Sequence, residues 1–311
     1  MGKIGIMGGT FDPTYKLVNN YTNATTNGLL TYKRFQQGGK NITNQLGPLA
    51  QRSACLSPES TVEFNDAVKG LFHQSNQIAK QYREGQMGRT GGFDVYENTL
   101  VPSHTTGTLA GSPVTTGASL GTATTTQNTW VSQTTIEVDG ATSGTTLLAG
   151  DIITLSGVYD VHPETKTTRG QLKTFVVQSA VTLTTAATAY EVTVKPGLIY
   201  GSGNAYQNCA LSGVSDTDNL TVSLIGAVGS AFGQDLQFHR DAFVFATADL
   251  EDVSRYGAWG ARSQKDGISM RLARQYAIAS DTVPCRIDVL FGFAGLYPEL
   301  ANRHMYELDL I

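Results

Sequence analysis

Short segments in which apolar and polar residues alternate occupy the middle of the chain. They are Thr134–Val138, Ile152–Ser156, Lys173–Gln178, Ala189–Val194 and Leu220–Ile225. Turn-forming residues, among them Asp139–Gly140 and Pro196–Gly197, separate these segments. Short strands at fairly regular spacing with turns between them indicate a small β-sandwich or barrel. The stretch from Thr105 to Asn128, just before them, consists mostly of Thr, Gly, Ser and Ala and offers little to form a core.

The low charge of the chain fits this β-rich interpretation. Only 15% of the residues are charged, while 40% are hydrophobic, as in an ordinary globular protein. A length of 311 residues is typical of about two domains. The net charge of −4 indicates no strong electrostatic attraction to nucleic acid. No apolar run approaches the roughly 20 residues that a membrane-spanning helix needs, so we expect no membrane partner.

The segment that precedes the alternating region is different in pattern. Residues 14 to 31 are polar and predict a loop. The following residues, Leu30–Phe35, predict the start of a short helix that Gly38–Gly39 end. Apolar positions at helical spacing predict a helix from about 58 to 73, and a second helical stretch is expected near 75 to 84.

Two further alternating patterns lie near the C-terminus. Ile268–Leu272 and Cys285–Phe293 alternate apolar with polar or small residues, which predicts two half-buried strands. If the strands pair as a hairpin, Arg271 and Asp288 lie on compatible polar faces. We expect the apolar face of the second strand to belong to the core, so that Val289→Asp would prevent folding by burying an unpaired charge.

Residues that could hold a metal ion are few and scattered. Cys55, Cys209 and Cys285 are odd in number and widely spaced, and no Cys-x-x-Cys occurs. We therefore expect buried, reduced thiols. No histidine lies at a metal-ligand spacing from another ligand; the histidines are His73, His104, His162, His239 and His304. The sequence predicts no metal site and no cofactor site.

Candidate catalytic groups have simpler structural explanations. His239 lies in Phe238–Asp241, which could form a proton-transfer cluster, but the polar face of a strand next to a turn is the favoured interpretation. Asp216–Asn219 resembles a calcium loop without its glycine and later glutamate, and a solvated hairpin tip is expected. No Gly-x-Ser-x-Gly elbow occurs, so we predict no catalytic residue. Solvated arginines that could instead contact partners are Arg83, Arg89, Arg255, Arg262, Arg271 and Arg274.

Two blocks of sequence carry a resemblance to a known family. The segments concerned are Gly70–Ser75, Lys80–Gly85 and Gly91–Asn98 in the first block, and Gln237–Leu250, Ile268–Tyr276 and Val283–Leu300 in the second. They resemble the major capsid proteins of short-tailed phages, in the branch whose subunits carry an inserted β-rich domain. The threonine-rich region between the blocks is where that insertion would lie.

This resemblance implies an α+β fold, the Johnson fold of tailed-phage and herpesvirus capsid proteins. Residues 14–104 and 233–311 would form the capsid-fold core, and residues 105–232 the β-rich insertion domain. The implied function is that of a non-enzymatic coat subunit in an icosahedral shell. The implied partners are copies of the same chain, with scaffolding and portal proteins and non-specific contact with packaged DNA. The chain would be made in the bacterial host cytoplasm and reside in the virion.

The match begins at about Thr31, whereas related subunits have well over a hundred further residues before that point. Those residues would supply an N-terminal arm, an extended loop and a long spine helix. We therefore interpret the chain as a coat protein truncated at its N-terminus. We expect it to form soluble monomers or small oligomers rather than closed shells when expressed alone.

Residues 1–13 look like a foreign leader. Lys3–Pro13 resembles the start of nicotinate-nucleotide adenylyltransferases, but that family continues with His-x-Gly-His, and here the first histidine is His73. In that family those histidines stabilise the departing pyrophosphate. Because this chain lacks them after Pro13, adenylyltransferase activity is the least favoured hypothesis. A β-rich binding module, such as a tail or adhesin component, is the main alternative to a coat subunit. The helical block expected at 58–84 and the apolar C-terminal strands fit that alternative poorly.

Overall fold

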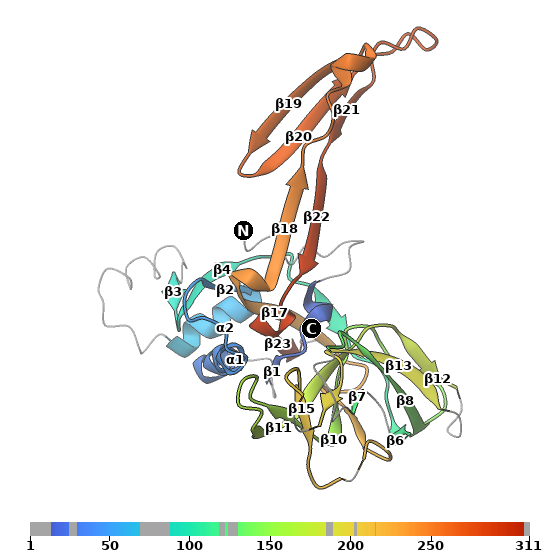
Figure 1. The fold of residues 1–311 in the computed structure, drawn as a ribbon. Coiled ribbons are helices and arrows are strands. Elements are labelled where there is room, and N and C mark those ends of the chain that lie inside the picture. Colours follow the sequence, from blue (N-terminus) through green and yellow to red (C-terminus); the bar gives the residue numbers. More distant parts are fainter. Residues whose placement is uncertain are drawn as a thin grey trace. The chain divides into compact units, whose positions relative to one another are not determined.

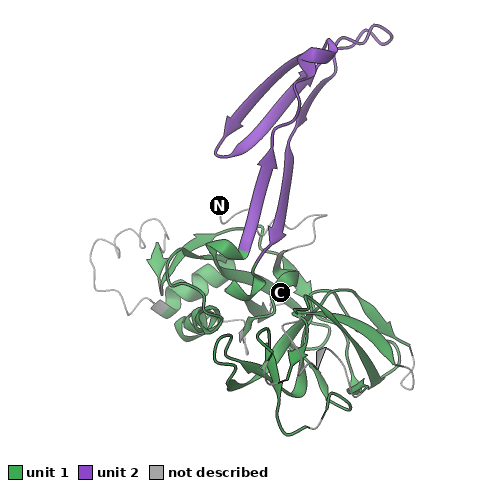
Figure 2. Ribbon diagram, in the orientation of Figure 1, with its two compact units in different colours: residues 1–242, 297–311 green, residues 243–296 purple. Residues whose placement is uncertain are grey.

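A computed structural model describes residues 14–24, 30–68, 88–117, 122–123, 130–184, 189–201, 204–214 and 216–307. Internal contacts divide the chain into two compact units (Figure 2). Unit 1 comprises residues 1–242 and 297–311, and unit 2 comprises residues 243–296. The expected leader at 1–13 and the helix expected at 75–84 lie outside the described residues. The described part is mostly β-strand with few helices, none of them long and apolar enough to cross a membrane.

The first sheet of unit 1, here called the central sheet, joins strands from both ends of the chain. Its order is β1-β23-β17-β2-β4-β3, with β5 added on β17. The strands are β1 (Tyr21–Ala24), β2 (Arg52–Leu56), β3 (Arg89–Thr90), β4 (Phe93–Glu97), β5 (Ser103–Thr105), β17 (Ala231–His239) and β23 (Ala301–Glu307). Strands β17 and β23 pair antiparallel from Phe232↔Glu307 to Phe238↔Ala301, while β1 runs parallel to β23. The loop predicted for residues 14 to 31 therefore contains an edge strand, as well as the 3-10 helix η1 (Thr14–Leu17).

Two α-helices lie against the central sheet (Figure 1). They are α1 (Tyr32–Asn44) and α2 (Pro58–Val68), and with the sheet they enclose a core that includes Phe35, Phe64 and Phe93. The Ser57 hydroxyl accepts the Ser60 N–H at 3.2 Å and caps the start of α2. The helix predicted from 58 is confirmed as far as Val68.

Helix α1 continues through Gly38–Gly39, so the prediction that these glycines end it is wrong. The reason is a close approach between the helix and the central sheet. A Cβ atom on Gly38 would come within 2.7 Å of Asn302 Nδ2 and 3.0 Å of His304 Nε2, and one on Gly39 within 3.1 Å of Phe93. The glycines serve packing rather than termination.

Replacing Gly38 by Ala tests this explanation. Alanine normally stabilises a helix by up to about 1 kcal/mol over glycine. Here we expect Gly38→Ala to lower the free energy of unfolding by about 1–3 kcal/mol, because the sheet side chains must move. Urea denaturation measures the change. Gln37→Ala, on the exposed face of the same helix, is the control and should be close to neutral; equal effects of the two variants would refute the explanation.

The second sheet of unit 1 confirms the strands predicted in the middle of the chain. Its order is β15-β10-β11-β13-β8-β6, with β16 added on β10. The strands are β6 (Gly111–Thr116), β8 (Thr134–Ala141), β10 (Ile152–Val161), β11 (Thr168–Val177), β13 (Tyr190–Lys195), β15 (Cys209–Leu211) and β16 (Val222–Leu224). Two small sheets complete the region, β9 (Thr145–Leu147) with β12 (Val181–Leu183) and β7 (Thr122–Ala123) with β14 (Ile199–Tyr200). One cluster of buried apolar side chains, from Leu109 to Val222, forms the core.

Strand β6 was not predicted, because it lies in the threonine-rich stretch that lacks apolar periodicity. Hydroxyl groups hold it instead. Thr115 is buried, and its Oγ1 donates to the Thr217 carbonyl at 2.6 Å and accepts the Leu220 N–H at 2.9 Å. A strand can therefore enter the sheet with threonine hydrogen bonds in place of a run of apolar side chains.

A buried polar cluster joins the two large sheets of unit 1. Arg303 of β23 is fully buried, and its Nη2 donates to the Gly150 carbonyl at 3.0 Å. Next to Gly150, Asp151 pairs with His104 Nε2 of β5 at 2.8 Å and accepts the Gly107 N–H at 3.1 Å. These contacts cross the junction, so they fix where the loop before β10 meets the central sheet.

Unit 2 contains two small sheets. A two-stranded ribbon pairs β18 (Phe243–Ala248) with β22 (Leu290–Gly295), and a three-stranded sheet has the order β19-β20-β21. Its strands are β19 (Trp259–Lys265), β20 (Ile268–Arg274) and β21 (Cys285–Asp288), and η3 (Val253–Tyr256) precedes them. Two short 3-10 helices, η2 (Arg240–Ala242) and η4 (Pro298–Leu300), belong to unit 1. The expected pairing is confirmed in β20 and β21, where Arg271 lies opposite Asp288. The single strand predicted over Cys285–Phe293 is wrong, because this segment is divided into β21 and β22, which belong to different sheets.

Candidate assembly surface

The structure does not assemble the candidate catalytic residues into one site. His239 is buried at the end of β17, where its Nδ1 accepts the Asp241 N–H at 3.3 Å. In the turn after β10, His162 Nδ1 accepts the N–H groups of Glu164 and Thr165. His73 lies outside the described residues. Among the described side chains, no group of three His, Cys, Asp or Glu could hold a metal ion.

The loop Asp216–Asn219 closes the open end of β6. Asp218 Oδ1 accepts the Gly117 N–H at 2.9 Å, and Thr217 donates its hydroxyl to the Gly117 carbonyl. Thr217 is fully buried, so the prediction of a solvated tip is wrong at this residue. The carboxylate of Asp218 is used to hold a strand end.

A polar groove in unit 1 separates α1 and β1 from β10 and β11. Its volume is about 560 Å³, and amide and hydroxyl side chains line much of it. Several of these amides are bonded within the chain: Asn19 Nδ2 donates to the Thr174 carbonyl at 3.2 Å, and Asn41 Nδ2 to the Tyr21 carbonyl at 3.0 Å. The first bond ties the segment before β1 to the second sheet, and the second ties α1 to β1, so the groove is part of the seam between the two sheets.

A buried carboxyl and a buried imidazole lie opposite each other in the central sheet. Asp235 of β17 and His304 of β23 are direct partners across the strands, so their side chains share one face. Asp235 Oδ1 accepts the Ser57 N–H at 2.8 Å. Burial, with a smaller contribution from Glu59, raises the pKa of Asp235 to about 7. Burial and the positive charge of Arg34 lower the pKa of His304 to about 3.

These two groups give opposite dependences of stability on pH. The stabilisation from Asp235 is complete below its unfolded pKa near 4 and is lost as pH rises through about 7. The stabilisation from neutral His304 is present above pH 6.5 and is lost as pH falls toward 3. Between about pH 6.5 and 4 the two groups change the free energy of unfolding in opposite directions as the pH changes. Each contributes up to about 1.4 kcal/mol per pH unit.

Single replacements should separate the two slopes. Asp235→Asn removes the carboxyl titration, so stability should fall more steeply than in the unchanged protein as pH drops from 6.5 to 4. His304→Gln should give the reverse slope, with stability rising over the same interval. Urea unfolding midpoints at half-unit pH steps measure both. Three identical pH profiles would show that neither group titrates as described.

The periodicity of apolar and polar residues did not predict this polar interior. Strand β17 carries Gln234, Asp235 and Gln237, and β23 carries the polar run Asn302–His304; such residues ordinarily indicate a solvent-exposed strand. Their burial depends on helix α1, which covers one face of β17 and β23, and on the second sheet, whose Ile152 and Val176 pack with Phe232 and Met305. A signal within the chain was Gly38–Gly39, since paired glycines in a helix mark a close approach to another element.

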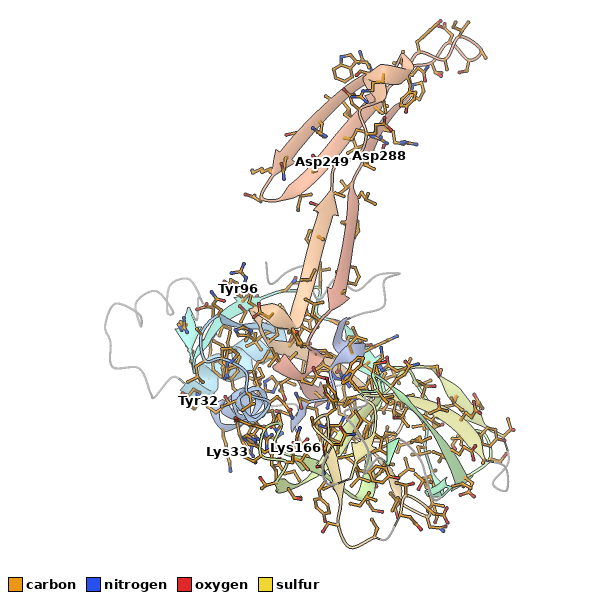
Figure 3. The ribbon with its side chains drawn as sticks, in the orientation of Figure 1. Tyr32, Lys33, Tyr96, Lys166, Asp249 and Asp288 are labelled. Atoms are coloured by element: carbon orange, nitrogen blue, oxygen red, sulfur yellow. The ribbon has the colours of Figure 1, made fainter. Side chains whose placement is uncertain are left out.

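The arginines expected to contact partners mostly pair within unit 2. Arg262 lies 3.3 Å from Asp249, and Arg271 lies 2.6 Å from Asp288; Figure 3 labels both carboxylates. In the same unit, Arg255 lies 4.0 Å from Glu251, and the Arg274 guanidinium lies 5.1 Å from the centre of the Trp259 ring. In unit 1, Arg89 lies 3.9 Å from Asp94. Arg83 lies outside the described residues. These arginines carry partners of their own.

The three-stranded sheet has one polar and one apolar face. Residues directly opposite in an antiparallel sheet share a face. Arg262, Arg271 and Asp288 are opposite one another and define the polar face. The segment before β19 packs there, since a Cβ on Gly260 would lie 2.7 Å from Val253. The other face, here called the apolar face, carries Trp259, Ala261, Ile268, Met270, Leu272, Cys285 and Ile287.

The apolar face is exposed in the subunit. Ile287 is 68% exposed, Trp259 54% and Met270 43%. Ser269 is the one buried residue among 243–296, so unit 2 has no apolar core of its own. More than half of the exposed large hydrophobic side chains of the described chain belong to this unit.

Two predictions about this region are wrong. Cys285 is exposed rather than buried, although Cys55 and Cys209 are buried as expected. Val289 is 38% exposed, so Val289→Asp is not expected to prevent folding by burying a charge. Alternation along a strand indicates an apolar face but does not show what covers it.

Comparison with known proteins identifies the family. The family model described as "P22 coat protein - gene protein 5" matches residues 16–306. The chain belongs to the P22 coat protein family. It is thus a structural subunit of a bacteriophage capsid that assembles with copies of itself, and the predicted resemblance is confirmed.

Other comparisons add less. No curated protein matches the chain. The solved structure of the CUS-3 coat protein I-domain is 22% identical and covers 40% of this chain and all of that domain, with a TM-score of 0.22. At this TM-score the likeness carries no argument about the fold, and the family assignment rests on the family model.

Proposed function

We propose that the chain acts in an icosahedral shell as a non-enzymatic subunit with the Johnson fold. The observation that carries this proposal beyond the family assignment is the exposed, coreless unit 2. A protein that works alone rarely exposes this many large apolar side chains in one unit without an apolar core, whereas a shell subunit covers them with neighbours. Among the described residues of this chain, the histidines lie far apart and the arginines pair with acidic residues of the same chain, so they do not form a catalytic site.

The proposed organisation follows the two sequence blocks. Residues 14–104 and 233–311 form the capsid-fold core, and residues 105–232 form an inserted β-domain. Two observations support this division: β17 and β23, from the second block, pair with β1 and β2 from the first, and the apolar cluster of the second sheet lies wholly between Leu109 and Val222.

The proposed partners, besides copies of the chain, are scaffolding and portal proteins. Packaged DNA is contacted without sequence specificity, in keeping with a net charge of −4. The subunit is made in the bacterial cytoplasm and resides in the virion. The reduced state of three widely spaced cysteines fits synthesis in that compartment.

Purified particles from the source phage or an induced prophage test this function. Mass spectrometry should find peptides from residues 105–232 and 243–296 among the most abundant virion proteins, because a shell contains many copies of its subunit. Antibody labelling in electron micrographs should decorate heads. Particles that lack the chain, or that label on tails alone, would favour the alternative of a tail component.

Expression of separate fragments tests the proposed domains. Residues 105–232 contain a complete apolar core, so this fragment should fold cooperatively and show β-sheet circular dichroism. Residues 243–296 have no buried apolar residue among those described and should remain unfolded as an isolated fragment. Phe175→Ala in the first fragment should cost about 3–5 kcal/mol. A folded 243–296 fragment, or an unfolded 105–232 fragment, would contradict the division.

A further inference from the structure

We propose that the apolar face of the β19-β20-β21 sheet docks against a second copy of this chain. The inference rests on the proposed function and deepens it, since it names the surface through which copies associate. The face is formed by directly paired residues, with Ala261, Leu272 and Ile287 in one row across the three strands. A neighbouring row pairs Ser263 with Met270.

The two faces of this sheet differ in how much of each is covered by contacts within the subunit. On the polar face, Arg271 donates to Asp288 through Nε and Nη2, and its Nη1 donates to the Glu251 carbonyl at 2.8 Å. The side chains of Arg271 and Asp288 are only 15% and 19% exposed. The polar face is thus closed by contacts within the subunit. The apolar face exposes Trp259, Met270 and Ile287, and no described segment covers those side chains.

An uncovered apolar sheet face needs a partner for stability. Small sheets become stable when one face packs on another layer, and unit 2 contains no such layer of its own. The centre of the face carries no charged side chain; Lys265 and Arg274 lie at its ends. Such a surface suits the apolar centre and charged rim of a protein interface.

The partner is another copy rather than DNA. Binding to a phosphate backbone requires a cluster of Lys and Arg on the contact surface. Here Arg262 and Arg271 lie on the opposite face, paired with Asp249 and Asp288. The charged residues of the apolar face are Lys265 and Arg274 at its two ends, which do not form a cluster. A coat protein assembles with copies of itself, so a second copy is the most abundant protein partner available to this face.

Cys285 provides a natural reporter on this face. It lies opposite Arg274 at the end of the sheet and is exposed. The other two thiols are buried, with Cys55 1% and Cys209 fully buried, and burial raises the pKa of Cys209 to about 12. A thiol reagent applied to the native protein should therefore modify Cys285 alone.

The experiment combines maleimide labelling with sedimentation of the full chain over a range of concentrations. As oligomers form, labelling of Cys285 should slow in proportion to the associated fraction. Ile287→Glu buries an unpaired charge in the proposed contact and should weaken association by about a hundredfold. Gln264→Glu adds the same charge to an exposed position on the polar face and should leave association unchanged.

Circular dichroism and thermal unfolding check that both variants fold, which their exposed positions lead us to expect. If Ile287→Glu does not fold, the labelling rate of Cys285 in the unchanged chain still tests whether this face is covered in oligomers. Oligomers in which Cys285 reacts at the monomer rate would overturn the proposal, as would equal weakening by both variants or a chain that stays monomeric throughout. The particle-composition test of the proposed function is independent of all these outcomes.

Discussion

The antiparallel pairing of β17 with β23 is the contact on which the rest of unit 1 depends. Strand β23 lies between β17 and β1, so it joins the first strand of the described chain to a strand near residue 235. The cap of α2 bonds to Asp235, and helix α1 lies over both strands. On the opposite face, Arg303 of β23 reaches the loop before β10. Strands β17 and β23 thus contact α1 on one face and the region of the second sheet on the other.

This pair of strands is buried on both faces yet carries polar side chains. Buried polar atoms left without partners cost roughly 1–3 kcal/mol each, and Asp235 Oδ2, Gln237 Oε1 and His304 Nε2 have none among the described atoms. The apolar clusters on either side offset that cost. In return, the register is strongly specified, because a shift of one residue would move Asp235 and Gln237 to the other face and break their bonds to Ser57 and to the Phe35 carbonyl.

The sequence predicts features that are determined by neighbouring residues better than features that depend on residues far away in the chain. The strands of the second sheet follow from alternation along short segments, and the Arg271–Asp288 pair follows from the periods of two neighbouring strands. Strand β6 depends on hydroxyl bonds to the loop containing Thr217, about a hundred residues away, so its own composition does not reveal it. The passage of α1 through Gly38 likewise depends on side chains of β17 and β23. The exposure of Val289 could not be predicted, since alternation is the same whether the core or a neighbour covers the face.

The two β-rich parts of the chain therefore obtain their stability from different sources. The second sheet of unit 1 encloses a complete apolar core, so its stability does not require another molecule. Unit 2 gains apolar burial, at about 25 cal/mol per Å², only when another surface covers it. Because a partner that binds the folded state stabilises it by mass action, ordering of unit 2 and association with a neighbour are linked equilibria. The ion pairs that close the polar face of the three-stranded sheet leave its apolar face for that association. The fold of the single subunit therefore already limits which of its surfaces are available for association with other copies.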